Sequence, residues 1–386
     1  MRFYHYPAQF VNSNCGFCSF YPAAPVRLIY IKYDKKQYII AMKIMFCGGG
    51  SAGHVMPNIA IYEVLRDKYD ISYIGTDGIE KNICADFKIP FCKFDGVKLV
   101  RGKILCNLAI PFKLIKSVRQ CKMLLNKFRP DLLFCKGGYA SLPPALAANK
   151  LGIPVITHES DLTAGLANKI IAGKSVKVLT TFRETAENFK NGVYTGSPMR
   201  NTLFGRDKNA SRKALNLDDR PTVLVFGGGS GSKKINDCLR QNLFALCGKF
   251  NVLHLCGRGN AIESNVYGYR QIEFCDDMGL IYACADYAVA RCGSNSAHEL
   301  IALKIPTLFI PLDNGSSRGD QVKNAEYFLD RGLCRVLPER DLSAESLKDG
   351  IIKLIDDDGL KKALGRCDTE CGNDKIIYEI EKAINR

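Results

Sequence analysis

Short apolar runs alternate with longer stretches of helical periodicity from Lys43 onward, and the same pattern starts again at Thr222. The strand-like runs lie at residues 43–46, 71–74, 131–135, 154–157 and 177–180, and then at residues 222–226, 252–255, 287–290, 307–310 and 335–337. Strands that alternate with helices are typical of parallel sheets covered by helices. The pattern therefore predicts an α/β fold with two Rossmann-like domains of parallel sheet that face one another across a cleft.

The two ends and the middle of the chain interrupt this pattern. Residues 1–41 show no periodicity, so we expect either a disordered extension or a mis-assigned start, with Met42 as the natural first residue. A proline followed by polar residues at 197–201 indicates a linker between domains. We therefore expect an N-terminal domain over 42–200, a C-terminal domain over 201–370, and a terminal helix over 371–386 that packs back on the first domain.

The net charge of +15 is concentrated in the first half of the chain. Residues 42–200 carry 23 Lys and Arg against 12 Asp and Glu, whereas residues 201–386 carry 26 of each kind. The first half is thus expected to face nucleic acid, an anionic lipid surface or a phosphorylated substrate. The 17 cysteines lack the spacing of a disulfide scaffold or zinc site, which favours a reducing cytoplasm and no bound metal.

One basic and apolar segment accounts for much of this charge. No acidic residue occurs between Asp95 and Asp131, and no apolar run is long enough to cross a bilayer. Basic residues near an anionic leaflet contribute roughly 1 kcal/mol each, and inserted apolar side chains add to the attachment. The residues expected at the membrane are Lys98, Leu99, Arg101, Lys103, Ile104, Leu105, Phe112, Lys113 and Lys116.

The same segment has helical spacing at Leu114, Val118, Cys121, Leu125 and Phe128, which predicts that these five side chains pack in the core. Nucleic-acid binding is disfavoured because the segment contains neither a zinc finger nor an aromatic RNA-binding strand.

Four polar loops follow predicted strands, at residues 48–54, 136–141, 158–161 and 227–232. Ligands of open parallel sheets bind at the carboxyl ends of strands, where glycine admits a close approach and helix N-termini attract anions. The loops lack the Gly-Lys-Ser/Thr ending of a P-loop. The acidic residue of a dinucleotide fold is also missing after the second strand, where residues 73–76 read Tyr-Ile-Gly-Thr.

Taken together, the loops resemble one family. The motifs GGGSAGHVMPN, KGGYASLPPALAA, GIPVITHES, AGLANK, TGSPMR, FGGGSGS, FCDDM and RCGSNSAHE occur in the order they have in the MurG family, from Met42 nearly to the C-terminus. That family consists of peripheral two-domain GT-B enzymes that transfer N-acetylglucosamine from UDP-N-acetylglucosamine to undecaprenyl-linked lipid I, giving lipid II for peptidoglycan. The resemblance implies the same inverting hexosyltransferase activity for this chain, at the cytoplasmic face of the cell membrane and without a cofactor.

The resemblance also implies the donor site. Glu299 would bind the ribose, Cys275 the uracil, and Asp320 with Gln321 the sugar, while a helix N-terminus would hold the diphosphate. The donor-binding residues expected on this basis are Ser51, Gly53, Arg200, Gly229, Ser230, Cys275, Ser294, Asn295, Ser296, Glu299, Asp320 and Gln321.

The catalytic base is expected in the first half. His54 closes the first glycine loop, and an imidazole with an ordinary pKa near 6.5 suits a general base. Asp161 is its rival, because residues 158–161 read His-Glu-Ser-Asp where the family commonly has His-Glu-Gln-Asn. Glu159 of the same motif is the third residue expected to be catalytic. The residues expected to bind the acceptor are Gly50, His54, Tyr139, His158, Asp161 and Asn168.

Two alternatives stay open on the sequence. A UDP-sugar:diacylglycerol glycosyltransferase would use the same fold and the same membrane. A non-catalytic subunit that recruits a partner to the membrane belongs to another class and would not release UDP. The peptide and lipid of the acceptor and the oligomeric state also stay open.

Overall fold

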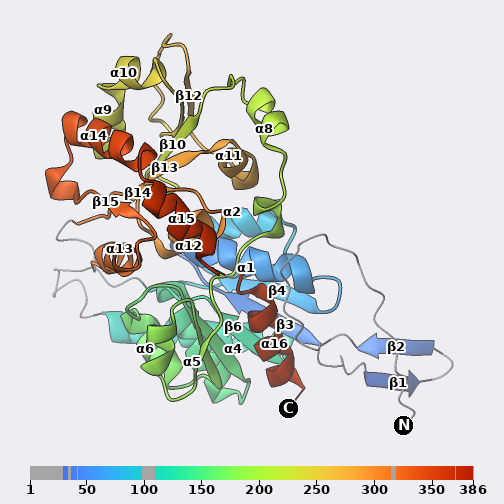
Figure 1. The fold of residues 1–386 in the computed structure, drawn as a ribbon. Helices are drawn as coiled ribbons and strands as arrows, with labels where there is room; N and C mark the ends of the chain where they lie inside the picture. Colours follow the sequence, from blue (N-terminus) through green and yellow to red (C-terminus); the bar gives the residue numbers. More distant parts are fainter. Residues whose placement is uncertain are drawn as a thin grey trace.

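The computed structural model describes residues 29–33, 36–40, 42–97, 109–313, 319–369 and 371–385. Two parallel sheets, each covered by helices, form the body of the molecule, with the C-terminal domain above the N-terminal one in Figure 1.

The N-terminal sheet has seven parallel strands in the order β5-β4-β3-β6-β7-β8-β9. Its strands are β3 (Lys43–Cys47), β4 (Asp70–Gly75), β5 (Phe91–Lys93), β6 (Leu132–Cys135), β7 (Val155–Glu159), β8 (Lys177–Thr180) and β9 (Gly192–Tyr194). One face packs against α1 (Ala52–Leu65), α2 (Ile79–Asp86) and α16 (Asn373–Ile384). The other face packs against α4 (Ile110–Phe128), α5 (Leu142–Lys150) and α6 (Leu166–Ala172).

The C-terminal sheet has six parallel strands in the order β12-β11-β10-β13-β14-β15. Its strands are β10 (Thr222–Phe226), β11 (Asn251–Leu255), β12 (Tyr269–Ile272), β13 (Tyr287–Ala290), β14 (Thr307–Phe309) and β15 (Arg335–Val336). The helices of this domain are α8 (Lys208–Ala214), α9 (Lys233–Arg240), α10 (Leu243–Cys247), α11 (Met278–Cys284), α12 (Ser294–Ala302), α13 (Asp320–Asp330), α14 (Ala344–Ile355) and α15 (Asp358–Arg366).

Every one of the ten apolar runs in the sequence forms a strand, which confirms the predicted α/β fold with two parallel sheets. The sequence pattern missed β5, β9 and β12, which lie at sheet edges. Edge strands are only half covered, and these three are short and partly exposed, so they lack a continuous apolar run.

Part of the N-terminal extension also forms strands. β1 (Ile29–Tyr33) pairs antiparallel with β2 (Lys36–Ile40), which the missing periodicity of this region did not predict. The rest of residues 1–41 lies outside the described residues.

Each domain contributes side chains to the core of the other. The short helix α7 (Arg183–Glu187) follows Phe182, whose ring packs edge-on to His298 of the C-terminal domain at a centroid distance of 4.8 Å. In return, α16 follows the C-terminal domain but places Ile376 and Ile380 in the core of the N-terminal one. Asn373 fastens this return, because its amide accepts from the Met199 N–H at 3.0 Å and donates to the Met199 carbonyl at 2.7 Å.

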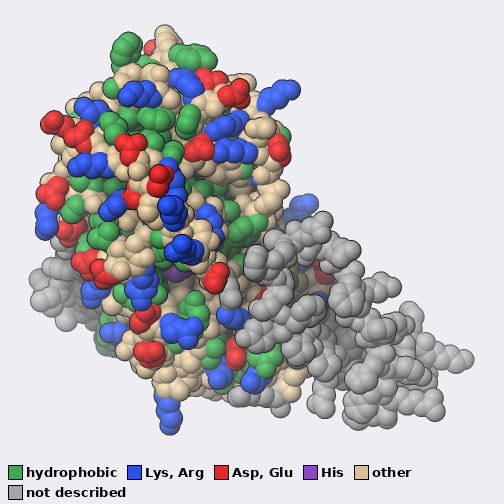
Figure 2. All heavy atoms as spheres, in the orientation of Figure 1, with side chains coloured by type: hydrophobic (Ala, Val, Ile, Leu, Met, Phe, Trp, Pro, Cys, Tyr) green, Lys and Arg blue, Asp and Glu red, His purple; other side chains and the backbone are tan. Residues whose placement is uncertain are grey.

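The surface charge of the C-terminal domain is balanced, as its sequence is. Figure 2 shows basic and acidic side chains interspersed over the C-terminal domain, whose half of the chain has equal numbers of each. No described helix is both long and apolar enough to span a membrane.

Candidate functional site

The carboxyl ends of the two sheets face each other, so their loops meet between the domains. Residues 48–51 connect β3 to α1, and residues 227–232 connect β10 to α9. One direct link between the domains is a hydrogen bond of 2.8 Å. It runs from the Asn295 amide, in the first turn of α12, to the Gly53 carbonyl, in the first turn of α1. The N-termini of α1 and α12 therefore lie against each other at the centre of the site.

A proline in α1 explains why this carbonyl is available. Pro57 has no N–H, and in a regular helix the N–H at this position would donate to the carbonyl four residues earlier, which is that of Gly53. Asn295 supplies the missing donor from the other domain.

The first glycine loop brings together three residues expected at the acceptor. Gly50 has φ +86°, and a Cβ there would lie 2.6 Å from Cε1 of Tyr139. His54 is half-buried in the first turn of α1, and a Cβ on Gly138 would lie 3.0 Å from its Cδ2. Glycines at 50 and 138 thus let Tyr139 and His54 approach the loop backbone.

A buried carboxylate that the sequence analysis missed supports this loop. Glu80 is fully buried; its Oε2 accepts from the Gly50 N–H at 3.2 Å and its Oε1 from the Thr76 N–H at 3.0 Å and the Thr76 hydroxyl. Both oxygens act as acceptors, as in an ionised carboxylate. A Glu in the first turn of a helix is ordinarily an exposed charge, so the sequence offered no signal for this role.

Glu159 holds the loop that follows β7. Its Oε1 accepts from the Asp161 N–H at 3.0 Å, and its Oε2 accepts from the Gly165 N–H at 3.1 Å and the Asn168 amide at 2.8 Å. Both Glu159 and Asn168 are buried. The structure therefore places these two expected site residues beneath the loop, where they shape it.

His158 lies deeper still. Its Nδ1 is 2.8 Å from Nζ of Lys136, and its Nε2 is 3.2 Å from the Gly196 carbonyl oxygen. Because an ammonium only donates, Nδ1 accepts and Nε2–H donates to the carbonyl. Burial, and then the Lys136 charge, hold the pKa of His158 well below its usual value. The imidazole is thus neutral and fully buried, and it contacts Lys136 instead of the cleft surface.

Asp161 lies where the domains touch. Its Oδ1 accepts a hydrogen bond of 3.2 Å from the amide of Asn324, on α13. The structure thus separates the two candidate bases by environment, since His54 adjoins the glycine loop of the N-terminal domain and Asp161 contacts a helix of the C-terminal domain.

The N-terminus of α12 carries Ser294, Asn295 and Ser296, as expected. Among the described side chains, none caps this helix, so its partial positive charge, about half an elementary charge, is available to an anion. The Ser294 hydroxyl donates to the Ser160 carbonyl, which ties this helix end to the N-terminal domain.

Glu299 lies one turn further along α12. Burial raises its pKa to about 7, which a hydrogen bond of 2.9 Å from the Tyr282 hydroxyl and the charge of Arg200 oppose. The Arg200 guanidinium also donates to the Asp276 carbonyl at 3.0 Å, beside the half-buried Cys275. The residues expected to bind ribose, uracil and diphosphate are therefore neighbours around Arg200.

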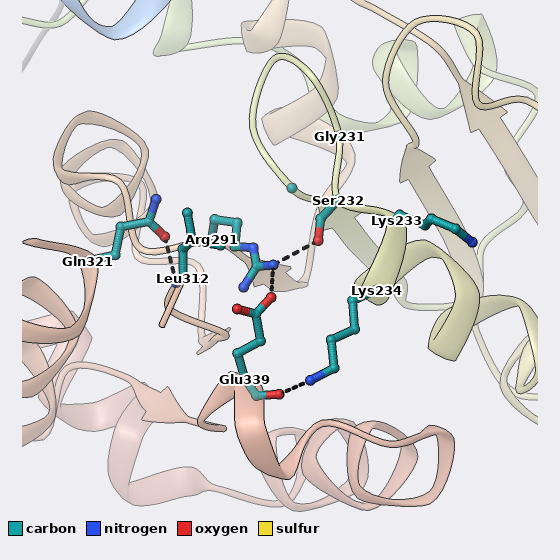
Figure 3. Close-up of a pocket in the computed structure, with 9 residues that line it drawn as sticks. Gly231, Ser232, Lys233, Lys234, Arg291, Leu312, Gln321 and Glu339 are labelled. Carbon is teal, nitrogen blue, oxygen red and sulfur yellow. Dashed lines mark hydrogen bonds and ion pairs between the residues drawn. The ribbon is translucent and has the colours of Figure 1, made fainter. Parts of the chain in front are cut away.

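A cavity of about 320 Å³ adjoins the second glycine loop (Figure 3). On one side, the Gln321 amide oxygen accepts from the Leu312 N–H at 3.0 Å. On the other, Arg291 donates to the Ser232 hydroxyl at 2.9 Å and pairs with Glu339. The lining residues are Gly227, Gly231, Ser232, Lys233, Lys234, Arg291, Leu312, Gln321 and Glu339.

Most of these lining residues were not expected from the sequence. Arg291 directly follows β13, and Lys233 and Lys234 begin α9 directly after the second glycine loop, so their positions at the carboxyl edge of the sheet were the available signal. The expected residues Gly229 and Ser230 are exposed in the same loop, and Asp320 accepts from the Thr163 hydroxyl at 3.3 Å.

The exposed face of α4 is apolar and basic. Phe112 is 77% exposed and Ile115 51%, and Lys113 and Lys116 lie beside them. Packing of the other face is confirmed, because the core of the N-terminal domain includes Val118, Cys121 and Leu125 and contacts Leu114 and Phe128. The expected membrane residues Lys98, Leu99, Arg101, Lys103, Ile104 and Leu105 lie outside the described residues.

Comparisons with known proteins agree on both domains. Residues 44–180 match the glycosyltransferase family 28 N-terminal domain, and residues 222–369 match the C-terminal domain of that family. A protein of Clostridium botulinum is 38% identical over 89% of this chain and 98% of its own length, and one of Lachnospira eligens is 42% identical over 82% and 91%. Both are named UDP-N-acetylglucosamine–N-acetylmuramyl-(pentapeptide) pyrophosphoryl-undecaprenol N-acetylglucosamine transferase.

Solved structures show the same fold at lower identity. MurG of Acinetobacter baumannii superposes with a TM-score of 0.68 at 23% identity, covering 89% of this chain and 99% of its own. The calicheamicin glycosyltransferase CalG4 reaches a TM-score of 0.67 at 14% identity, over 90% and 99%.

Proposed function

Because the chain belongs to glycosyltransferase family 28 and, within it, to the pyrophosphoryl-undecaprenol N-acetylglucosamine transferases, we propose the reaction that its two domains carry out. The enzyme transfers N-acetylglucosamine from UDP-N-acetylglucosamine to the muramyl 4-hydroxyl of undecaprenyl-pyrophosphoryl-N-acetylmuramyl-pentapeptide. This step converts lipid I to lipid II in peptidoglycan synthesis.

The proposed chemistry is a single inverting displacement. The acceptor hydroxyl oxygen bonds to the anomeric carbon as the bond from that carbon to UDP breaks, and the hydroxyl proton moves to His54. A base of this kind contributes about 10²- to 10⁴-fold to a rate. We assign it to His54 because Tyr139, Gly50 and the imidazole gather on the acceptor side, whereas Asp161 bonds to the C-terminal domain.

The donor is assigned to the C-terminal domain. Glu299 accepts from the ribose hydroxyls, Arg200 and the N-terminus of α12 stabilise the diphosphate as UDP leaves, and Gln321 binds the sugar. Arg200 supports this assignment because its charge acts on Glu299 and its guanidinium donates to the loop at Asp276.

One observation carries the proposal. The hydrogen bond between Asn295 and Gly53 places the residue next to His54 against the helix end assigned to the diphosphate. The proposed base and leaving group would thus lie close together, on the two sides of this hydrogen bond between domains, which supports a direct displacement.

The test uses the purified protein with UDP-N-acetylglucosamine and a short-chain lipid I analogue, followed for UDP release and for the disaccharide product. We expect UDP and the disaccharide to form in equal amounts. Transfer to diacylglycerol in a parallel reaction, with none to the lipid I analogue, would replace the acceptor. Donor binding without UDP release in either reaction would indicate a non-catalytic subunit.

We also propose reversible docking on the cytoplasmic face of the membrane through α4. Phe112 and Ile115 would enter the leaflet while Lys113 and Lys116 face its anionic headgroups. Changing Phe112 to Ser should lower partitioning to anionic vesicles roughly 10- to 100-fold, since a buried Phe contributes roughly 1.5–3 kcal/mol.

Phe244 on α10 is the matched control, because it is 90% exposed but belongs to the C-terminal domain. Phe244→Ser should leave vesicle binding unchanged. Equal binding to neutral and anionic vesicles would contradict the proposal, as would equal losses in the two variants.

A further inference from the structure

Four consecutive residues of the N-terminal domain, 160–163, bond to the two helices assigned to the donor. We call these residues the latch. The Ser160 carbonyl accepts from Ser294 on α12, and the Thr163 hydroxyl donates to Asp320 on α13 at 3.3 Å. Between them, the fully buried amide of Asn324 donates to Asp161 at 3.2 Å and accepts from the Leu162 N–H at 3.2 Å.

The latch is one of the places where the two domains contact each other. Ser294 and Asp320 are the first residues of α12 and α13, and the expected diphosphate and sugar sites lie on those helix ends. A change in the latch therefore moves the donor side relative to the acceptor side. A misplacement of about 1 Å at a reacting centre is enough to cost roughly 100-fold in rate.

One buried lysine supports the latch from below. Lys136 follows β6 and is only 1% exposed. Its Nζ lies 2.8 Å from Nδ1 of His158 and donates to the Ser160 hydroxyl. The mechanism proposed above gives this lysine no task, although its charge is costly to bury unless it is compensated.

Charged and titratable groups surround Lys136 on every side that packs against it. The carboxylates of Glu159 and Asp161 attract its charge. Asp161 belongs to the latch, and Glu159 supports the latch by accepting from the Asp161 N–H. Two imidazoles also lie near Lys136: that of His158, in the same domain, and that of His298, on α12 of the other domain. Burial lowers the pKa of both, and the Lys136 charge adds to each shift. The two imidazoles are thus neutral, and the carboxylates are the counter-charges.

We propose that Lys136 is a positioning residue of the transferase: its ammonium group holds residues 160–163 in the conformation that grips α12 and α13. This inference rests on the proposed function for its kinetic consequence. The latch itself is independent of that function, because it is a set of hydrogen bonds between domains.

The charge of Lys136 is lost at moderately alkaline pH. Burial lowers the pKa of Lys136 to about 8, although Glu159 and Asp161 raise it in part. Below about pH 8 the ammonium is present and the latch is held; as pH rises through this value the attraction to the two carboxylates disappears. Transfer should therefore fall with rising pH through the loss of one proton.

The kinetic test compares Lys136→Met, which keeps an unbranched side chain one atom shorter and removes the charge, with Lys136→Arg, which retains a charge that does not titrate. Lys150, exposed at the end of α5, gives the control variant Lys150→Met. We expect kcat of Lys136→Met to be about 100-fold lower, with UDP affinity unchanged and the alkaline decline absent. Lys136→Arg should recover part of kcat and keep it above pH 8, and Lys150→Met should behave as wild type.

A second measurement does not require activity or a variant that folds. Hydrogen exchange of the wild-type protein, corrected for its intrinsic pH dependence, should show residues 160–165 losing protection between about pH 7 and pH 9, while β10 stays protected. Protection that is unchanged over this range would overturn the proposal, as would a Lys136→Met enzyme with wild-type kcat or with the alkaline decline intact. Loss of protection in a protein without transferase activity would instead reject the proposed function and keep the latch.

Discussion

The glycine loop at residues 48–51 and the glycine loop at residues 227–232 occupy equivalent places in the two domains. Each follows the central strand with which its domain's pattern begins, and each leads into a helix at the carboxyl edge of a parallel sheet. Their supports differ in charge. The first loop rests on the buried carboxylate of Glu80, whereas the second bonds through Ser232 to the buried guanidinium of Arg291.

The charge beside each loop indicates which loop suits the leaving group. A carboxylate beneath residues 48–51 disfavours a further negative charge. Beside residues 227–232, the guanidinium and two lysines outnumber the one carboxylate of Glu339, which pairs with Arg291, and this excess of positive charge favours an anion. Two loops with similar glycine patterns are therefore expected to serve different ligands. The N-terminal loop would position a hydroxyl and its base, and the C-terminal loop would face the nucleotide diphosphate.

The largest expected effect comes from removing the base on the acceptor side. His54→Ala should lower kcat about 10²- to 10⁴-fold and leave UDP binding unchanged, because the imidazole belongs to the loop without the diphosphate. Steady-state kinetics and UDP titration measure the two quantities. Asp161→Asn is the comparison, and near-normal turnover in His54→Ala with none in Asp161→Asn would transfer the role of base to Asp161.

A smaller loss of transfer activity should follow from altering Glu80, which supports the first glycine loop. Glu80→Gln keeps the shape of the side chain but turns an N–H₂ group toward donors at Gly50 or Thr76. An unsatisfied buried polar group costs about 1–3 kcal/mol, so urea unfolding should show a loss of this size. Transfer should decline with it, whereas UDP affinity should not. A selective loss of UDP affinity would show that the first loop holds the nucleotide.

The pH dependence of UDP binding tests whether the C-terminal domain holds the nucleotide. The pKa of Glu299 is raised to about 7, so below this pH the carboxyl is protonated and accepts fewer ribose hydroxyls. The UDP dissociation constant should increase about tenfold per pH unit below pH 7, the slope of a single proton. Glu299→Gln should bind weakly with no such slope.

The contribution of Glu299 to the free energy of unfolding should depend on pH in the opposite direction to UDP affinity: it decreases as pH rises. The folded protein holds the Glu299 proton between the ordinary carboxyl pKa, near 4.3, and about pH 7, so this group's contribution is lost as pH rises through that window. Urea unfolding of the wild type and Glu299→Gln at several pH values separates this contribution from others. A UDP affinity that is independent of pH from 5 to 7 would contradict the assigned role.

The smallest expected effect concerns the contact between the helices. Pro57→Ala adds an N–H that competes with Asn295 for the Gly53 carbonyl, and a hydrogen bond of this kind contributes about 1 kcal/mol. We expect kcat to fall about fivefold while thermal stability is kept or raised. Pro143→Ala is the control, because a proline in the first turn of α5 withholds no helical hydrogen bond. Equal effects in both variants would count against the contact.

Much of the site was predictable because its residues follow strands. His54, Asn295 and Glu299 stand in motifs directly after apolar runs, and strand ends of a parallel sheet meet at one edge. Glu80 and Lys136 were not predicted as site residues, since nothing in their local sequence separates a buried charge from a solvated one. Glu159 and His158 were expected to face the substrates, yet burial directs them to the latch and to Lys136.

Periodicity alone predicts the two helix-covered parallel sheets of this protein, and the order of the motifs indicates the enzyme family. Such features are local, since periodicity and loop composition act within a few residues of chain. The charge beneath each glycine loop and the residues that join the domains follow instead from long-range contacts in the folded chain. Glu80 meets Gly50, and Asn324 meets Asp161, through folding of segments far apart in the chain. Burial then makes these contacts strong, because a charge or amide removed from water must find its partner in the protein.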